Sequence, residues 1–305
     1  MRNRNVTRAR LEVLLAAVLF GTTGTALALG PDSASPIGVG AARIVVGGAL
    51  LAALAAATGA LRGPWPIGLV LSAGVGVAVY QLSFFEAVDR TGVAIGAIVA
   101  IGSGPVFVGA FERLVDGVWP GRRWAVATAI ATAGVALLTI SGVEGASADV
   151  TGIGLALVAG AGYATYTVIA KRLIRAGHAP VGVMGIAFGT AAVLLIPVLL
   201  FTGIRWLGSD SGIVLALYLG ILPTAGAYVL FARGLTHLPA SEVATIVLAE
   251  PLTATALGVL ALDETFGALD AAGAVLVLAA LAILGAGGLR ATCVLARLRR
   301  RAPSR

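Results

Sequence analysis

The chain has 305 residues, of which 59% are hydrophobic and 11% charged, with a mean hydropathy of +1.01. Soluble proteins are about 45–50% apolar and about 25% charged, so this composition excludes an ordinary soluble domain. Cys293 is the only cysteine, which excludes internal disulfides and cysteine-rich metal sites. Neither a metal nor a cofactor is expected.

Long apolar segments follow one another along almost the whole chain. Roughly 18 or more such residues in a row are enough to cross a bilayer as a helix, whereas a barrel strand needs about ten alternating residues. The predicted spans are 11–29, 36–57, 66–86, 91–111, 124–141, 152–171, 181–201, 211–232, 241–261 and 269–289. The first has no clear cleavage site and is expected to remain as a helix. The sequence predicts an all-α polytopic membrane protein with ten transmembrane helices.

The basic residues lie mainly on one side of these spans. With the N-terminus inside, only Arg90 and Arg205 fall in outer segments and Arg43 falls within a helix, while every other Lys and Arg falls in an inner segment. This bias predicts a cell-membrane protein with both termini in the cytoplasm. The basic tail, 291–305, is expected to face anionic lipid, so the net charge of +7 indicates the bilayer as partner and not nucleic acid.

The second half of the chain faintly repeats the first, at an offset of about 144 to 148 residues. Pro36 aligns with Pro180, and Pro105 aligns with Pro251. The expected units are 10–141, 152–290 and the tail, with a small acidic linker between the halves. Because each half has five helices, the second is expected to be inverted, as in secondary transporters that bind substrate between two repeats.

Several short motifs fall at characteristic positions in the predicted helices. They are Phe20-Gly21-Thr22-Thr23, Arg43, Tyr163 to Arg172, Pro239-Ala240-Ser241, Leu248-Ala249-Glu250-Pro251 and Leu262-Asp263-Glu264. In order and spacing they resemble the drug/metabolite transporter superfamily, in its EamA-type branch of ten-helix proteins. The resemblance covers residues 10–290, with Phe20 in place of the usual Trp and Gly104 where the second half has Glu250. It implies transport of small organic molecules, often export of amino acids or related metabolites.

Glu250 is the sharpest candidate for chemistry. It is expected near the bilayer centre, where a carboxylate costs about 2.5–3.5 kcal/mol on insertion scales. Pro251 removes the helical donor of the Val247 carbonyl and can kink the helix beside that carboxyl. Glu250 is therefore a candidate coupling residue for a proton or another ion. The alternative, a structural hydrogen bond or ion pair, stays open.

The other candidates are polar or helix-breaking residues at depth. Tyr80, Gln81, Tyr163, Tyr166, Tyr228 and Thr22 are predicted to line a substrate cavity, and Arg43, Glu86, Pro105 and Pro251 to serve gating or structure. Tyrosine offers an aromatic wall with a polar tip. Arg43 is expected to snorkel or to pair with Glu86 or Asp89, with a substrate carboxylate as the alternative. Thr22 can instead bond its own helix.

The leading hypothesis is a secondary transporter of a small organic metabolite by alternating access, with proton coupling as a further hypothesis. No ATP-binding signature is present, so an ion gradient or the gradient of the solute would drive it. An intramembrane enzyme would need converging catalytic groups at depth, and neither His178 nor His237 lies in a predicted span. A facilitative channel and a non-transporting membrane subunit remain the alternatives. Substrate, direction, coupling ion and oligomeric state are left open.

Overall fold

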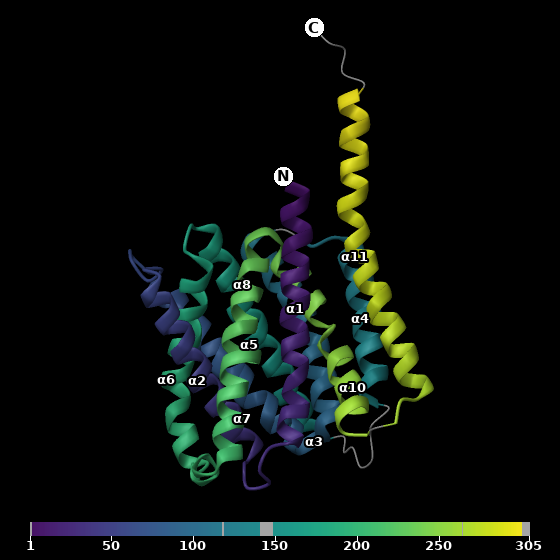
Figure 1. The fold of residues 1–305 in the computed structure, drawn as a ribbon. Helices are drawn as coiled ribbons and strands as arrows, with labels where there is room; N and C mark the ends of the chain where they lie inside the picture. The colour runs from purple at the N-terminus through teal and green to yellow at the C-terminus, as the bar shows by residue number, and fades with distance from the viewer. Residues whose placement is uncertain (1, 118, 141–148, 264, 301–305) are drawn as a thin grey trace.

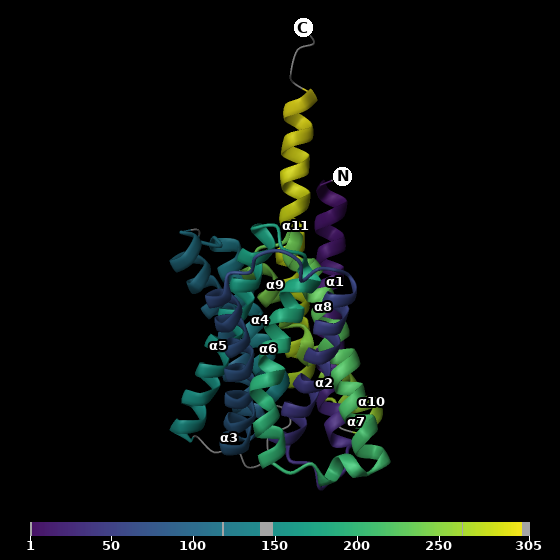
Figure 2. The ribbon, with the colours of Figure 1, turned by 90° about the vertical axis from the view of Figure 1, so that its left-hand side faces the viewer.

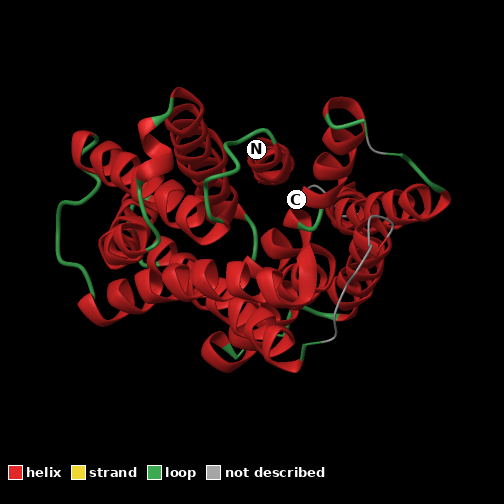
Figure 3. Ribbon diagram, turned by 90° about the horizontal axis from the view of Figure 1, so that it is seen from below, coloured by secondary structure: helices red, strands yellow, loops and turns green. Residues whose placement is uncertain are grey.

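The computed structural model describes the chain except for residues 1, 118, 141–148, 264 and 301–305 (Figure 1). Throughout the described ranges the regular structure is helical, and helices joined by loops make up the bundle in Figure 3. Ten of the helical stretches are long and apolar enough to cross a membrane. The predicted fold class, an all-α polytopic membrane protein with ten spans, is confirmed.

The helices take the following order along the chain. They are α1 (Arg2–Ala28), α2 (Pro36–Ala57), α3 (Ile67–Asp116), α4 (Arg122–Ile140), α5 (Val150–Arg175), α6 (Pro180–Phe201), η1 (Arg205–Gly208), α7 (Asp210–Gly220), η2 (Ile221–Gly226), α8 (Ala227–His237), α9 (Ala240–Val247), α10 (Glu250–Ala261) and α11 (Ala268–Arg300). The third and fourth spans, Ile67–Gly92 and Ile95–Asp116, both belong to α3. The π-helical turn η2 joins α7 to α8 in the eighth span, and α9 and α10 share the ninth.

The turn between the third and fourth spans differs from the sequence expectation. The predicted spans 66–86 and 91–111 left residues 87–90 for a turn, but those residues are helical, and the non-helical backbone inside α3 is confined to Gly92, at φ 81° and ψ 159°. The chain doubles back there. The two arms of the turn lie so close that a Cβ on Gly96 would be 3.0 Å from the Val88 nitrogen. Residues with a Cβ rarely adopt this φ/ψ region, so the tight reversal requires glycine at this position.

Helix packing pairs the two halves of the chain. The second span, α2, packs on the seventh, α6, and the fifth, α4, packs on the tenth, α11. The first span, α1, contacts the eighth and ninth through α8 and α10, while the sixth, α5, contacts α3, which holds the third and fourth. Exchanging the two halves leaves this pattern unchanged. It is the packing that an internal duplication would produce.

Small residues allow the central helices to approach closely. A Cβ on Gly162 of α5 would lie 2.8 Å from the Gly76 carbonyl oxygen of α3, and one on Gly48 of α2 would lie 2.3 Å from the Phe188 carbonyl oxygen of α6. Lipid tails are as apolar as leucine, so tight backbone contact of this kind stabilises helix pairs in membranes.

Both chain ends lie at the same end of the bundle, here called the termini side, and α1 and α11 extend past their neighbours there (Figures 1 and 2). The opposite end, the far side, carries the α1–α2 connection, the Gly92 turn and the connections from α6 to α7 and from α10 to α11. The apolar span of α11 ends at Ala286, but its backbone helix continues to Arg300, so most of the predicted basic tail is helical.

Candidate functional site

The ninth span is broken in its middle. The helix α9 ends at Val247 and α10 begins at Glu250, with Pro251 in its first turn. Between them the Leu248 and Ala249 nitrogens donate to carbonyls only three residues back, at 3.2 and 3.0 Å. The bend expected from Pro251 is therefore present. It leaves the half-buried Glu250 at a helix N-terminus, where unpaired N–H groups and the helix dipole favour negative charge.

The helix α1 passes directly beside this break. A Cβ on Gly21 would lie 2.5 Å from the Glu250 carbonyl oxygen and 2.6 Å from the Thr253 Cβ, so α1 fits there because residue 21 is glycine. The Thr22 hydroxyl donates to the Leu19 carbonyl of its own helix at 2.8 Å, the alternative considered from the sequence. The neighbouring Thr23 hydroxyl is buried and has no hydrogen-bond partner among the described residues.

Arg43 and Gln81 form a polar pair between α2 and α3. Arg43 donates from Nη2 to the Gln81 side-chain oxygen at 3.0 Å, and Gln81 is only 1% exposed. Arg43 Nε and Gln81 Nε2 are buried without a partner in the described part of the chain. The described residues contain no direct ion pair between Arg43 and Glu250.

Aromatic rings fill the space beside these charges. Tyr166 and Tyr228 are buried, and their hydroxyls share a hydrogen bond of 3.0 Å. The Phe188 ring lies 4.0 Å from that of Tyr228, and the Tyr163 ring lies 5.3 Å from that of Tyr166. Tyr80 joins the cluster at 6.1 Å from Tyr163. This is a packed wall, in which the Tyr163 hydroxyl is buried without a partner among the described residues.

The structure thus brings most predicted site residues to one region. Arg43, Tyr80, Gln81, Tyr163, Tyr166, Tyr228 and Glu250 come from five helices, α2, α3, α5, α8 and α10. Glu86 lies elsewhere, toward the far side, where its carboxylate accepts from Arg90 at 2.7 Å and not from Arg43. Pro105 is buried within α3, which continues through it without a break.

Two aromatic neighbours went unnoticed in the sequence. Phe231 and Phe188 are fully buried against Tyr228, with Phe231 at 5.6 Å and Phe188 at 4.0 Å between ring centroids. Phe231 follows Tyr228 by three residues on α8, so helical spacing could have placed it on the same face. Phe188 lies on α6, and only the helix packing brings it near.

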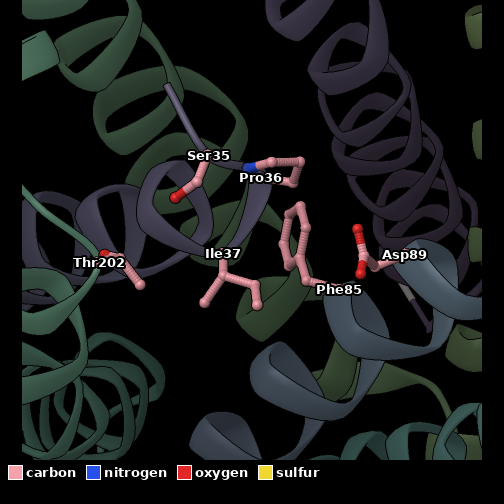
Figure 4. A pocket seen from close by; sticks show the side chains of 6 residues that line it. All are labelled: Ser35, Pro36, Ile37, Phe85, Asp89 and Thr202. Carbon is pink, nitrogen blue, oxygen red and sulfur yellow. The ribbon is translucent and has the colours of Figure 1, made fainter. Parts of the chain in front are cut away.

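A cavity of about 290 Å³ opens at the far side (Figure 4). Ser35, Pro36, Ile37, Phe85, Asp89 and Thr202 line it. Phe85 lies against Gly40, where a Cβ would come within 2.6 Å of the Phe85 ring and 2.4 Å of Gln81 Nε2. Phe85 follows Gln81 by about one helical turn on α3, so the cavity lining includes a neighbour of the Arg43–Gln81 pair.

Polar contacts join α9 to α1, α3 and α4 on the termini side. Arg10 of α1 pairs with Glu242 at 2.7 Å, and Thr128 of α4 shares a hydrogen bond of 2.8 Å with Thr245. Glu112 of α3 accepts from the first backbone nitrogens of α9. The sequence did not single out Glu112, because nothing in its surroundings distinguishes it from an ordinary acidic residue at a helix end.

Known proteins share this architecture. A solved crystal structure superposes with a TM-score of 0.76 at 23% identity, covering 96% of this chain and 99% of its own. The chain is 40% identical over 277 residues to the uncharacterized transporter YwfM of Bacillus subtilis, covering 90% of this chain and 93% of that protein. It is 30% identical over 267 residues to the threonine/homoserine exporter RhtA of Salmonella typhimurium strain LT2, covering 83% of each.

The family comparison agrees with the resemblance seen in the motifs. The sequence pattern of the EamA-like transporter family matches the chain twice, over residues 8–140 and 150–286. Most of the chain is covered by these two matches, and the resemblance to the EamA-type branch of the drug/metabolite transporters is confirmed. The chain belongs to the EamA-like transporter family.

Proposed function

We propose that this protein is a secondary transporter that exports amino acids or closely related metabolites across the cell membrane by alternating access. The observation that carries this is the position of Glu250. It lies at the break between α9 and α10, against Gly21 of α1, and the neighbouring Phe20 ring lies 5.1 Å from that of Tyr228 in the tyrosine wall. Two units, 10–141 and 152–290, would enclose this site as inverted repeats, and the paired packing of their helices supports that division.

The charges of the site favour a zwitterionic substrate. Glu250 can receive an ammonium group, and Arg43 can receive a carboxylate, since the two side chains make no direct ion pair with each other in the described structure. The tyrosine wall suits the aliphatic part of a small solute. The name of RhtA, a threonine/homoserine exporter, supports the same substrate class.

The orientation follows from the basic residues. Those that the structure places at the termini side include Arg10, Arg113, Arg123 and Arg175, so this side is proposed to face the cytoplasm. The cavity at Phe85 would then face the exterior, and the described conformation would be closed to the cytoplasm. Glu250 is proposed to couple transport to a proton or another ion by exchanging it for the substrate.

Ligand-dependent thermal stabilisation tests the substrate class. The purified protein would be heated with each of the common amino acids, because a ligand that binds only the folded state raises the melting temperature. A stabilising amino acid should lose its effect in Glu250→Gln and in Arg43→Gln. It should keep its effect in Asp32→Asn, which alters an exposed carboxylate in a far-side loop.

Flux in proteoliposomes then separates the candidate activities. A transporter gives saturable flux of the stabilising amino acid and counterflow against a preloaded vesicle, whereas a channel gives flux without counterflow. A non-transporting subunit gives neither. Loss of gradient-driven flux with retained exchange in Glu250→Gln would support coupling, and unchanged flux at every pH would remove Glu250 from that role.

A further inference from the structure

The N-terminus of α9 is capped by a side chain from the other half of the chain. Glu112 of α3 is 5% exposed, and its two carboxylate oxygens accept from the backbone nitrogens of Ala240 at 2.8 Å and Ser241 at 3.2 Å. Pro239, at the N-cap position, makes no side-chain cap of its own. Glu112 therefore satisfies N–H groups that no residue of α9 satisfies, with a charge that the helix dipole favours.

The preceding helix end is held in the complementary way. Lys171 of α5 is 6% exposed and donates from Nζ to the Leu235 carbonyl, one of the last carbonyls of α8. A cation at a helix C-terminus and an anion at a helix N-terminus are both stabilising. The short turn between α8 and α9, at Leu238 and Pro239, is thus clamped by Glu112 on one flank and Lys171 on the other.

Further contacts fix the same segment. Trp124 of α4 donates from Nε1 to the Ser241 carbonyl at 3.1 Å, and the Thr128–Thr245 hydroxyl pair lies one turn further along α9. On the far side, the described residues include an ion pair of 3.8 Å between Arg90 and Asp149, whose side chains are 43% and 33% exposed. Exposed pairs of that kind contribute little to stability. Among the described residues, the buried polar contacts that hold α9 lie on the termini side.

We propose that Glu112 is the latch of an inner gate, an acidic cap that must leave the N-terminus of α9 before the central site can open on the termini side. This inference rests on the proposed alternating access and deepens it. Opening on that side requires α9 to part from α3 and α4, because Glu112, Trp124 and Thr128 hold it from the first half. Intermediate positions of Glu112 are unfavourable, because a partly withdrawn carboxylate would lose both N–H donors without reaching water. The gate is therefore either closed or open.

Distance measurement by paired spin labels tests the latch without any substrate. Labels would be placed at Arg113→Cys on α3 and His237→Cys on α8, both exposed positions on the termini side, in a Cys293→Ser background. Glu112→Gln keeps the shape of the side chain but removes its charge and one acceptor. The ratio of long to short label distances should rise about tenfold over the ratio in the same labelled protein with Glu112 intact, as expected for loss of a charged hydrogen bond.

A matched control lies one helical turn away. Asp116 on α3 is also a carboxylate and pairs with Arg175, whose side chain is 51% exposed. Asp116→Asn should leave the distance distribution unchanged, because it breaks only a solvent-exposed pair. An unchanged distribution in Glu112→Gln, or an equal shift in both variants, would overturn the latch.

Two further measurements keep the test decisive. If Glu112→Gln fails to fold, Thr128→Val releases α9 at a neighbouring contact and should lengthen the same distance. In proteoliposomes with a transported amino acid, either variant should strengthen apparent binding from the termini side and weaken it from the far side, because apparent affinity scales with the population of the competent state. The distances test the latch even if no amino acid is transported, so the two proposals can fail separately.

Discussion

Gln81 is buried between α2 and α3, and its side-chain oxygen fixes one arm of the Arg43 guanidinium. From the sequence it was predicted to line a cavity, and this stays a prediction. Its position against Gly40 gives it a second role, in which it holds the Arg43 guanidinium in place. The absence of a side chain at residue 40 is what leaves room for the amide.

Gly40→Ala should therefore weaken substrate binding indirectly, by displacing Gln81, although residue 40 itself touches no substrate. The new Cβ would lie 2.4 Å from Gln81 Nε2, so Gln81 must move and release Arg43. We expect affinity for the stabilising amino acid to fall about tenfold, with a loss of about 1–3 kcal/mol in stability from overpacking. Thermal titration measures both. Gly24→Ala, where a Cβ meets nothing within 4 Å, is the control and should change neither.

The Tyr166–Tyr228 hydroxyl pair gives a second prediction at this scale. Tyr166→Phe leaves the buried Tyr228 hydroxyl without its partner, at a cost of about 1–3 kcal/mol in the free energy of unfolding. The double variant Tyr166→Phe/Tyr228→Phe should cost less than the sum of the single changes, because both polar groups then leave together. Additive losses, measured by reversible unfolding in detergent, would mean that the bond contributes nothing.

At the scale of elements, the sequence predicted the helices far better than their interruptions. The spans 36–57 and 181–201 were placed within a residue, because uniform apolarity over the length of a bilayer admits few other structures. The break before Glu250 was predicted from Pro251. The continuity of α3 through Pro105 and the one-residue reversal at Gly92 were not, because neighbouring helices decide whether a proline bends or a glycine turns.

The break in the ninth span should matter more for turnover than for stability. Pro251→Ala restores a donor to the Val247 carbonyl and favours a continuous helix from α9 into α10. We expect the turnover number in proteoliposomes to fall about tenfold while the melting temperature stays equal or rises, because alanine is the stronger helix former. Pro105→Ala, in a helix that is already continuous, is the comparison. Equal effects of both would show that the break has no special role.

At the scale of the whole molecule, charge asymmetry predicts which end faces the cytoplasm, and helix packing predicts how the halves meet. The sequence could suggest the candidate residues Arg43, Tyr163 and Glu250 separately, since each is polar at depth. It could not show that Arg43 bonds Gln81 or that Glu112 caps α9, because those pairs are far apart in the chain and depend on three-dimensional packing.

Orientation can be checked with the native cysteine. Cys293 lies in the part of α11 beyond the apolar span, on the termini side, so a membrane-impermeant maleimide should label it only after the membrane is opened. Residue 32 lies in the far-side connection between α1 and α2. A cysteine placed there, as Asp32→Cys in a Cys293→Ser background, should be labelled in intact cells. The reverse pattern would invert the proposed topology.

The reversal at Gly92 also bears on how the protein is made. With a single residue between two helical segments, the third and fourth spans have no loop that could wait on the far side while the second segment follows. We expect the two to enter the bilayer together, as a helical hairpin. Substitutions at Gly92 would therefore be felt during membrane insertion, as lowered yield, before any effect on a finished carrier could be measured.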